Sequence, residues 1–180
     1  MLIMAGVGGA VSPFMPSDQI PNTTAGAFTF YMVLTGWLTV KRPEGTARPF
    51  DAIIMLIPLG GALIGAYLTT RAEYKGIEHI AGFVICGLAS LCVVGDLHLV
   101  LRRGLTGRAR ISRHVWRMCT GLLMAVMSFF TGQQKYLPEI VRGTFWVNVP
   151  GLIVLVLMVF WLLRVWVTRA FRAQPAVAIS

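Results

Sequence analysis

Long apolar segments separated by short charged stretches constrain the fold of this chain more than any other feature. An α-helix needs about 20 mostly apolar residues to cross the roughly 30 Å of hydrocarbon in a bilayer. Charged residues make up only 13% of the chain and hydrophobic residues 56%, whereas soluble domains carry about 25% charged residues. The sequence therefore predicts an all-α integral membrane helical bundle, with one domain over residues 1–172 and a disordered tail over 173–180.

We expect five full transmembrane helices and a short first one. The full helices are predicted at about residues 23–40, 52–70, 77–101, 114–133 and 146–168. Residues 1–15 are apolar, but at 1.5 Å per residue they cover only about two thirds of a bilayer. Pro13 and Pro16 would end a helix there. We therefore expect the first helix to be short or truncated, and the sequence leaves open whether Met1 is the native start.

An arginine-rich connection between the fourth and fifth predicted helices indicates the orientation of the chain. Six arginines lie within residues 93–119, and no acid follows Asp96 until Glu139; they are Arg102, Arg103, Arg108, Arg110, Arg113 and Arg117. Lysine and arginine accumulate in cytoplasmic loops of membrane proteins. With a cytoplasmic N-terminus, residues 41–51, the arginine-rich connection and the C-terminal tail all lie inside. The pattern thus predicts a protein of the cytoplasmic (inner) membrane with both termini cytoplasmic.

The formal net charge of +9 could also suggest a nucleic-acid partner. The basic residues, however, lie at the ends of apolar segments and not along one amphipathic face. We therefore expect no nucleic acid, and we expect anionic lipid at the cytoplasmic face as the partner of these charges.

Asp96 and Arg117 are predicted to face each other. Each lies about ten residues from the middle of the connection, near residues 106 and 107, so an antiparallel hairpin brings them to the same depth. A lone charge at such a depth usually finds a partner. We expect a structural ion pair that fixes the helix register; an anion site or the start of a proton path is the alternative. Helical spacing and depth also suggest four residues that could form a polar interior of the bundle: His98, His114, Ser128 and Gln133.

Small residues are predicted to pack the helices. Gly61 and Gly65 have a GxxxG spacing, and Gly121 lies in line with Arg117 on the fifth helix. The three cysteines, Cys86, Cys92 and Cys119, lie inside apolar segments without metal-binding spacing, so they are expected to be small buried hydrophobic residues. No metal is expected.

The histidines raise the question of a cofactor. A b-type haem needs two imidazoles at one depth, and only His98 and His114 satisfy that condition. His114 follows Arg113 near the predicted membrane surface, so we expect no cofactor and keep haem as an alternative. No pair of nucleophile and base, no phosphate loop and no paired carboxylates occur at usable spacing, which argues against an enzyme.

The segment 110–134 resembles a group of bacterial predicted inner-membrane proteins with an Arg-His-Leu/Val-Trp-Arg-Met-Cys opening and a Ser-Phe-Phe-x-Gly-Gln close. The matching positions are Arg113, His114, Trp116, Arg117, Met118, Cys119, Ser128, Phe129, Phe130, Gly132 and Gln133. A looser likeness extends over FYMVLTGWLTVKRPEG and GDLHLVLRRGLTG, and so to most of the chain. The resemblance implies a multi-pass bacterial membrane protein and no particular mechanism. Those proteins begin with a longer first segment, which agrees with the expected truncation.

Three functional hypotheses follow from these features. The first is a non-enzymatic membrane component, either an accessory subunit of a partner protein or a homo-oligomer. The second is a small-molecule or proton-coupled transporter that uses Asp96 and Arg117. The third is a haem-containing electron carrier.

Overall fold

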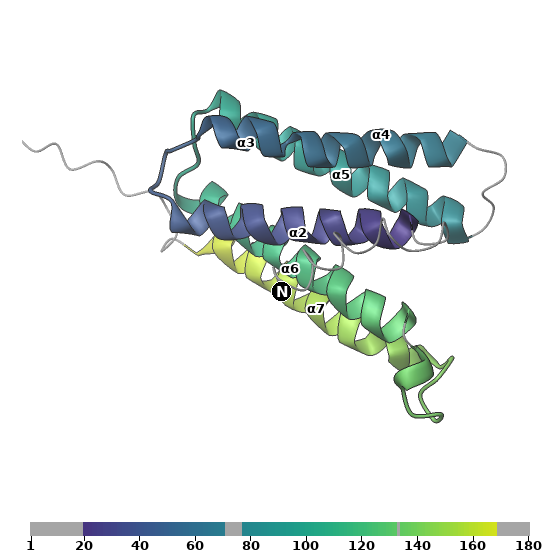
Figure 1. Ribbon diagram of the computed structural model, residues 1–180. Helices are drawn as coiled ribbons and strands as arrows, with labels where there is room; N and C mark the ends of the chain where they lie inside the picture. The colour runs from purple at the N-terminus through teal and green to yellow at the C-terminus, as the bar shows by residue number, and fades with distance from the viewer. Residues whose placement is uncertain (1–19, 71–76, 133, 169–180) are drawn as a thin grey trace, which may run out of the picture. The chain divides into compact units, whose positions relative to one another are not determined.

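The structure is a computed structural model, and it describes residues 20–70, 77–132 and 134–168. All regular secondary structure in these residues is helical (Figure 1). The long helices and the short ones next to them are α2 (Ile20–Lys41), α3 (Pro49–Ile54), α4 (Leu56–Thr70), α5 (Ile77–Leu101), α6 (Gly107–Gly132), η3 (Gln134–Tyr136), η4 (Phe145–Asn148) and α7 (Val149–Val167). The expected all-α class is confirmed.

Three segments of the described residues are long and apolar enough to cross a membrane: Pro49–Tyr67, Phe83–Leu101 and Phe145–Val167. They also expose many large apolar side chains, such as Leu63, Val94 and Val156. Soluble monomers rarely expose so much continuous apolar surface, so these segments indicate a membrane protein. The expectation of five full spans is confirmed only for these three. The expected short first helix lies outside the described residues.

The third predicted helix is divided into α3 and α4 at Met55. Pro58 has no N–H to donate to the carbonyl four residues earlier, so the helical ladder is interrupted at this place. The helix also begins earlier than predicted, at Pro49, where a proline at the first helical position is tolerated. The carboxylate of Asp51 accepts a hydrogen bond from the backbone N–H of Arg48 at 2.7 Å and so caps this start.

Helix α6 begins at Gly107, about seven residues before the predicted start. Three arginines that we assigned to a loop, Arg108, Arg110 and Arg113, are therefore helical, and that assignment was wrong. Arginine has a high intrinsic helix propensity, and in this position these side chains find acceptors on neighbouring helices, as described below.

The chain divides into two compact units. Of the described residues, the α4–α5 unit contains 20–31, 45–70 and 77–105, and the α6–α7 unit contains 32–44, 106–132 and 134–168. Helix α2 thus contributes its first part to one unit and its last part to the other. The single domain expected from the sequence stays a prediction.

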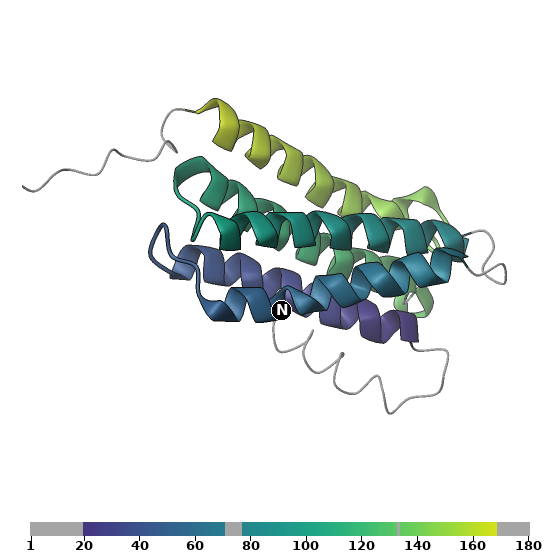
Figure 2. The same ribbon diagram turned by 90° about the horizontal axis from the view of Figure 1, so that it is seen from above.

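In the α4–α5 unit, α4 and α5 lie side by side and antiparallel (Figure 2). A Cβ atom on Gly65 would come within 3.1 Å of the backbone nitrogen of Cys86, and one on Gly61 within 3.8 Å of the Cβ of Ala89. The GxxxG spacing of α4 therefore faces α5, where the missing side chains let the helices approach closely.

Two connections of the α4–α5 unit are joined to each other. The backbone N–H of Gly45 donates to the carbonyl of Leu105 at 3.1 Å, and that of Ala47 donates to the carbonyl of Arg103 at 2.9 Å. Gly104 lies at this junction with φ +137°, and a Cβ atom there would stand 2.2 Å from the carbonyl carbon of Gly45. The connections 45–48 and 102–105 are therefore held together at one end of the unit.

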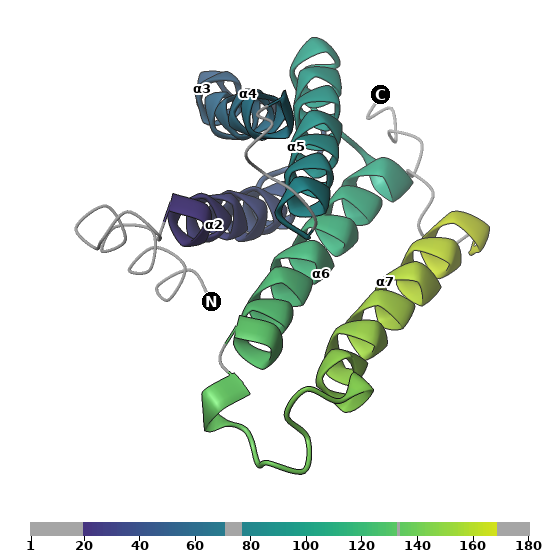
Figure 3. The same cartoon turned by 90° about the vertical axis from the view of Figure 1, so that its right-hand side faces the viewer.

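In the α6–α7 unit, α6 and α7 are adjacent and antiparallel along their length (Figure 3). Arg108 donates to the carbonyl of Thr168 at 3.0 Å. The hydroxyl of Thr120 lies 3.8 Å from the sulfur of Met158. At the other end of the pair, Met127 covers Gly151.

Candidate functional site: the arginine face of helix α6

The first half of α6 carries a polar face that lies against the last part of α2 in the same unit. Arg110, Arg113, His114 and Arg117 recur at steps of three and four residues, which places them on one side of the helix. We call these four residues the arginine face. Each has a hydrogen-bond partner on α2 or in the residues that follow it.

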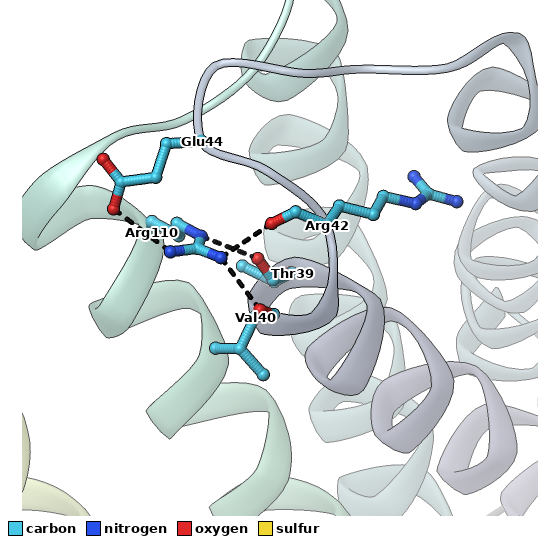
Figure 4. Close-up of polar contacts among 5 residues, drawn as sticks. All are labelled: Thr39, Val40, Arg42, Glu44 and Arg110. Carbon is cyan, nitrogen blue, oxygen red and sulfur yellow. Dashed lines mark hydrogen bonds and ion pairs between the residues drawn. The ribbon is translucent and has the colours of Figure 1, made fainter.

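Arg110 binds the C-terminal end of α2 (Figure 4). Its Nε donates to the carbonyl of Thr39 at 2.9 Å. Its Nη2 donates to the carbonyls of Val40 at 2.8 Å and Arg42 at 2.7 Å. Its Nη1 forms an ion pair with Glu44 at 3.1 Å. The last carbonyls of a helix have no partner within the helix and carry the negative end of its dipole, so this guanidinium caps α2 both by hydrogen bonds and by charge.

The rest of the arginine face reaches further along α2. Arg113 Nε donates to the hydroxyl of Thr39 at 3.2 Å. His114 Nδ1 lies 2.8 Å from the carbonyl of Gly36 and, since a carbonyl only accepts, must carry the proton of this bond. Arg117 Nη1 donates to the hydroxyl of Thr35 at 2.5 Å.

Arg117 is 0% exposed. It lies ten residues after the start of α6, which is about 15 Å along the axis at 1.5 Å per residue. A buried cation is costly unless polar groups solvate it. The hydroxyl of Thr35 supplies part of that solvation.

Gly36 makes the close approach of α2 and α6 feasible. A Cβ atom on Gly36 would lie 3.2 Å from the Cβ of Arg117 and 3.2 Å from the sulfur of Met118. We did not single out this glycine in the sequence. The signal that could have found it is a face of α2 with three small residues, Thr35, Gly36 and Thr39.

Helix dipoles explain why these arginines are tolerated where they lie. The first turn of α6 contains no acid, and the positive end of its own dipole disfavours arginine. Arg110, however, caps the C-terminal end of α2, and Arg108 binds the carbonyl of Thr168 just after α7. Because both neighbours are antiparallel to α6, their negative ends compensate the positive charges of its start.

No family model matches this chain, and neither a curated protein nor a solved structure matches it. The resemblance to bacterial inner-membrane proteins therefore stays a prediction. The arginines and the histidine among its matching positions, Arg113, His114 and Arg117, all belong to the arginine face.

Asp96 lies in the α4–α5 unit and is 1% exposed. Its carboxylate accepts a hydrogen bond from the hydroxyl of Tyr31, which is also fully buried. Ala89 and Cys92 precede Asp96 on the same side of α5, and both are 0% exposed. The expected ion pair of Asp96 with Arg117 joins residues of the two units and stays a prediction.

The other residues singled out in the sequence are dispersed. His98 and Ser128 are exposed, so the described part of the chain does not enclose them, and Gln133 lies outside the described residues. Gly121 is buried, as is Cys92, while Cys86 and Cys119 are half-buried. The described residues contain no group of three histidine, cysteine or acidic side chains that could hold a metal ion.

Replacing Arg110 tests the capping of α2. We expect Arg110→Gln to lower the free energy of unfolding by about 1.5 kcal/mol, the lower end of the range for hydrogen bonds to charged groups, because the side chain is partly exposed. Unfolding of the purified protein by denaturant in detergent micelles measures this loss. The matched control is Arg102→Gln, an exposed arginine, with an expected change within about 0.5 kcal/mol. Equal losses in the two variants would contradict a specific cap.

Proposed function

We propose that the protein is a non-enzymatic component of the cytoplasmic membrane, either an accessory subunit or a homo-oligomer. The observation that carries this proposal is the use of the arginine face. A catalytic or ligand site presents polar groups to its substrate, whereas Arg110, Arg113, His114 and Arg117 all bond to carbonyls or hydroxyls of α2, or to residues just after it. These contacts stabilise a helix pair, so in this proposal the arginine face has a structural role.

In this proposal both termini are cytoplasmic, and anionic lipid is the partner of the basic end. The joined connections of the α4–α5 unit support it, because they hold Arg48, Arg102 and Arg103 at one end of two membrane-spanning segments. All three side chains are exposed. Basic residues at the cytoplasmic end of a span attract anionic headgroups by about 1 kcal/mol each.

Reporter fusions test the orientation. A fluorescent protein fused after Ser180, which folds only in the cytoplasm, should give a bright signal in bacterial cells, because positive loops stay inside. Alkaline phosphatase, which is active only outside the cytoplasm, should be inactive when fused at the same place. The same two reporters fused after Glu139 should give the opposite pattern. A reversed result would overturn the orientation.

Two glycines support an assembly of several chains or of this chain with a partner helix. Gly61 and Gly65 are covered by α5, but a Cβ atom on Gly60 or Gly87 would meet nothing within 4 Å. Small residues on the outer side of a membrane helix allow another helix to approach at backbone distance. In this proposal, Gly60 on α4 and Gly87 on α5 lie at such contacts.

Bulky substitutions test the homo-oligomer. We expect the wild-type protein to have a mass of more than one chain in detergent, measured by light scattering and corrected for bound detergent. Gly87→Leu should shift it towards the monomer without loss of helical circular dichroism, because the new side chain meets only the neighbouring molecule. Gly65→Leu is the contrasting variant and should unfold, since its side chain would collide with the backbone of Cys86. A monomeric wild type, or a Gly87→Leu protein of unchanged mass, would rule out this homo-oligomer.

The second candidate function is a transporter of a small molecule or of protons. The burial of Asp96 and Arg117 favours it, since ionisable residues inside a membrane often mark transport paths. Each of them bonds to a hydroxyl of α2, that of Tyr31 or that of Thr35. Hydroxyl groups can solvate a structural charge or pass on a proton, so the contacts alone fit both functions.

Flux measurements separate the two functions. Asp96→Asn, Arg117→Gln and the double variant are reconstituted in vesicles that contain a pH-sensitive dye. We expect the three variants and the wild type to show the same proton leak as empty vesicles. We also expect the stability loss of the double variant to be smaller than the sum of the single losses, because paired charges are coupled. A proton flux that requires either residue would replace the structural proposal by transport, and additive losses would contradict the pair.

Haem binding stays the third hypothesis. The bond from His114 Nδ1 to Gly36 leaves its Nε2 as the nitrogen that could bind a haem iron. A second imidazole at the same depth would be required. Protein purified from cells supplied with haem would show a Soret band if the hypothesis holds, and its absence would remove it.

A further inference from the structure

The connection between α6 and α7 exposes large apolar side chains. Four residues within Gln134–Asn148, which we call the α6–α7 loop, are each more than two thirds exposed: Tyr136, Ile140, Phe145 and Trp146. Ile140 reaches 85%. A water-exposed loop is usually polar, because each buried methylene group gains about 0.8 kcal/mol on leaving water. The composition of this loop is therefore unusual for a segment surrounded by water.

The backbone of the α6–α7 loop is largely satisfied by the loop itself. Four N–H groups, those of Leu137, Val141, Thr144 and Val147, donate to carbonyls three residues earlier, at 3.0 to 3.3 Å. The N–H of Gly143 donates to the side-chain oxygen of Gln134 at 3.1 Å. Internal bonding of this kind is required where water is scarce, since an unpaired backbone group costs free energy there.

Arg142 braces the same loop from within. Its Nε donates to the carbonyl of Leu137 at 2.9 Å, and its Nη2 donates to the carbonyl of Lys135 at 2.8 Å. Its charge is thus directed to the backbone of η3 and of the residue that follows it. The ammonium group of Lys135 lies 5.0 Å from the ring centre of Tyr136. Apart from these two cations the loop contains one charge, that of Glu139.

The position of the loop fits a bilayer surface. Phe145 and Trp146 belong to the apolar segment Phe145–Val167 that can cross a membrane. The loop therefore comes directly before this span in the chain, and its last residues belong to the span. It lies at the end of α6 that is opposite the arginine face. Tryptophan and tyrosine are enriched at this depth, where a ring can lie among headgroups.

We propose that the α6–α7 loop is an internally braced wedge that lies in the headgroup layer of the membrane, with Ile140 and Trp146 in contact with lipid. Lipid is the occupant that fits, because the apolar side chains continue the lipid-facing surface of α7 and the backbone needs little water. Arg142 is the positioning residue that holds the shape. The inference requires membrane insertion but not the proposed accessory role, so its test uses neither mass nor flux.

The depth of Ile140 tests the wedge. Ile140→Cys is labelled with a fluorophore in a background in which the native cysteines are replaced by alanine, and the protein is reconstituted in phosphatidylcholine and phosphatidylglycerol vesicles. The matched control is Glu139→Cys, an exposed neighbour in the same loop. Nitroxide lipids should quench the label at 140 at least about two-fold more than the label at 139, because an interfacial apolar face lies about 5 to 10 Å deep. Aqueous iodide should show the reverse order.

The result also distinguishes lipid from other occupants. Equal iodide quenching at both positions without lipid quenching would place the loop in water and overturn the wedge. If neither quencher reaches residue 140, protein covers the loop, and lipid is the wrong occupant. If the cysteine-free background does not fold, lipid quenching of the wild type minus that of Trp146→Phe gives the same measurement at Trp146.

Arg142→Gln tests the bracing. We expect the difference between positions 140 and 139 to fall at least about two-fold in this variant, because the loop loses both bonds from the guanidinium. Lys135→Gln removes a cation from the same loop without removing a bond to its backbone, and it should keep the full difference. Equal behaviour of the two variants, or an unchanged depth in Arg142→Gln, would show that Arg142 does not position the loop.

Discussion

The hydrogen bonds between Arg110 and the end of α2 satisfy two groups that would each be unfavourable alone. The last carbonyls of α2 lack helical partners, and a largely buried guanidinium has lost much of its water. In the α6–α7 unit, Arg110 meets the carbonyls of Thr39, Val40 and Arg42 within 2.9 Å. Each group supplies what the other has lost. The remaining polar contacts of the arginine face depend on this register, because His114 and Arg117 lie one and two turns further along the same helix.

The planar shape of the guanidinium explains why arginine fills these positions. Its donors point in several fixed directions, whereas a lysine ammonium is a compact and strongly hydrated point charge. Arg108, Arg110 and Arg142 all donate to backbone carbonyls, and together they serve both ends of the α6–α7 unit. A formal charge of +9 therefore overstates the charge offered to lipid or to any other anionic partner, since part of it is directed inwards.

The sequence allowed the helices to be predicted because their signals are local. Apolar segments of sufficient length gave α4, α5 and α7 nearly as the structure has them, and the GxxxG spacing of Gly61 and Gly65 pointed to a packed face. The start of α6 was missed because a dense run of arginines resembles a solvated loop. In the structure these arginines are helical and bond to groups far away in the chain. Arg110 and Arg113 bond to Thr39 on α2, and Arg108 bonds to the carbonyl of Thr168, so these partners lie 60 to 74 residues away. Local sequence contains no information about such a partner.

The candidate site was predictable only where its signals are local in the sequence. The burial of Asp96 agrees with its position inside the apolar helix α5, and that of Arg117 with its position ten residues inside α6. Their hydroxyl partners on α2, Tyr31 and Thr35, depend on how helices distant in sequence are packed. Gly36 escaped notice because it lacks a second glycine at GxxxG spacing, although its contact with Arg117 and Met118 is nearly as close as that of Gly65 with Cys86. Motifs reveal a close approach when both small residues lie on one helix. When a single glycine faces a large polar side chain, as Gly36 faces Arg117, the glycine is required by the register of the two helices. Here the bonds of Arg110 to the end of α2 help to set that register.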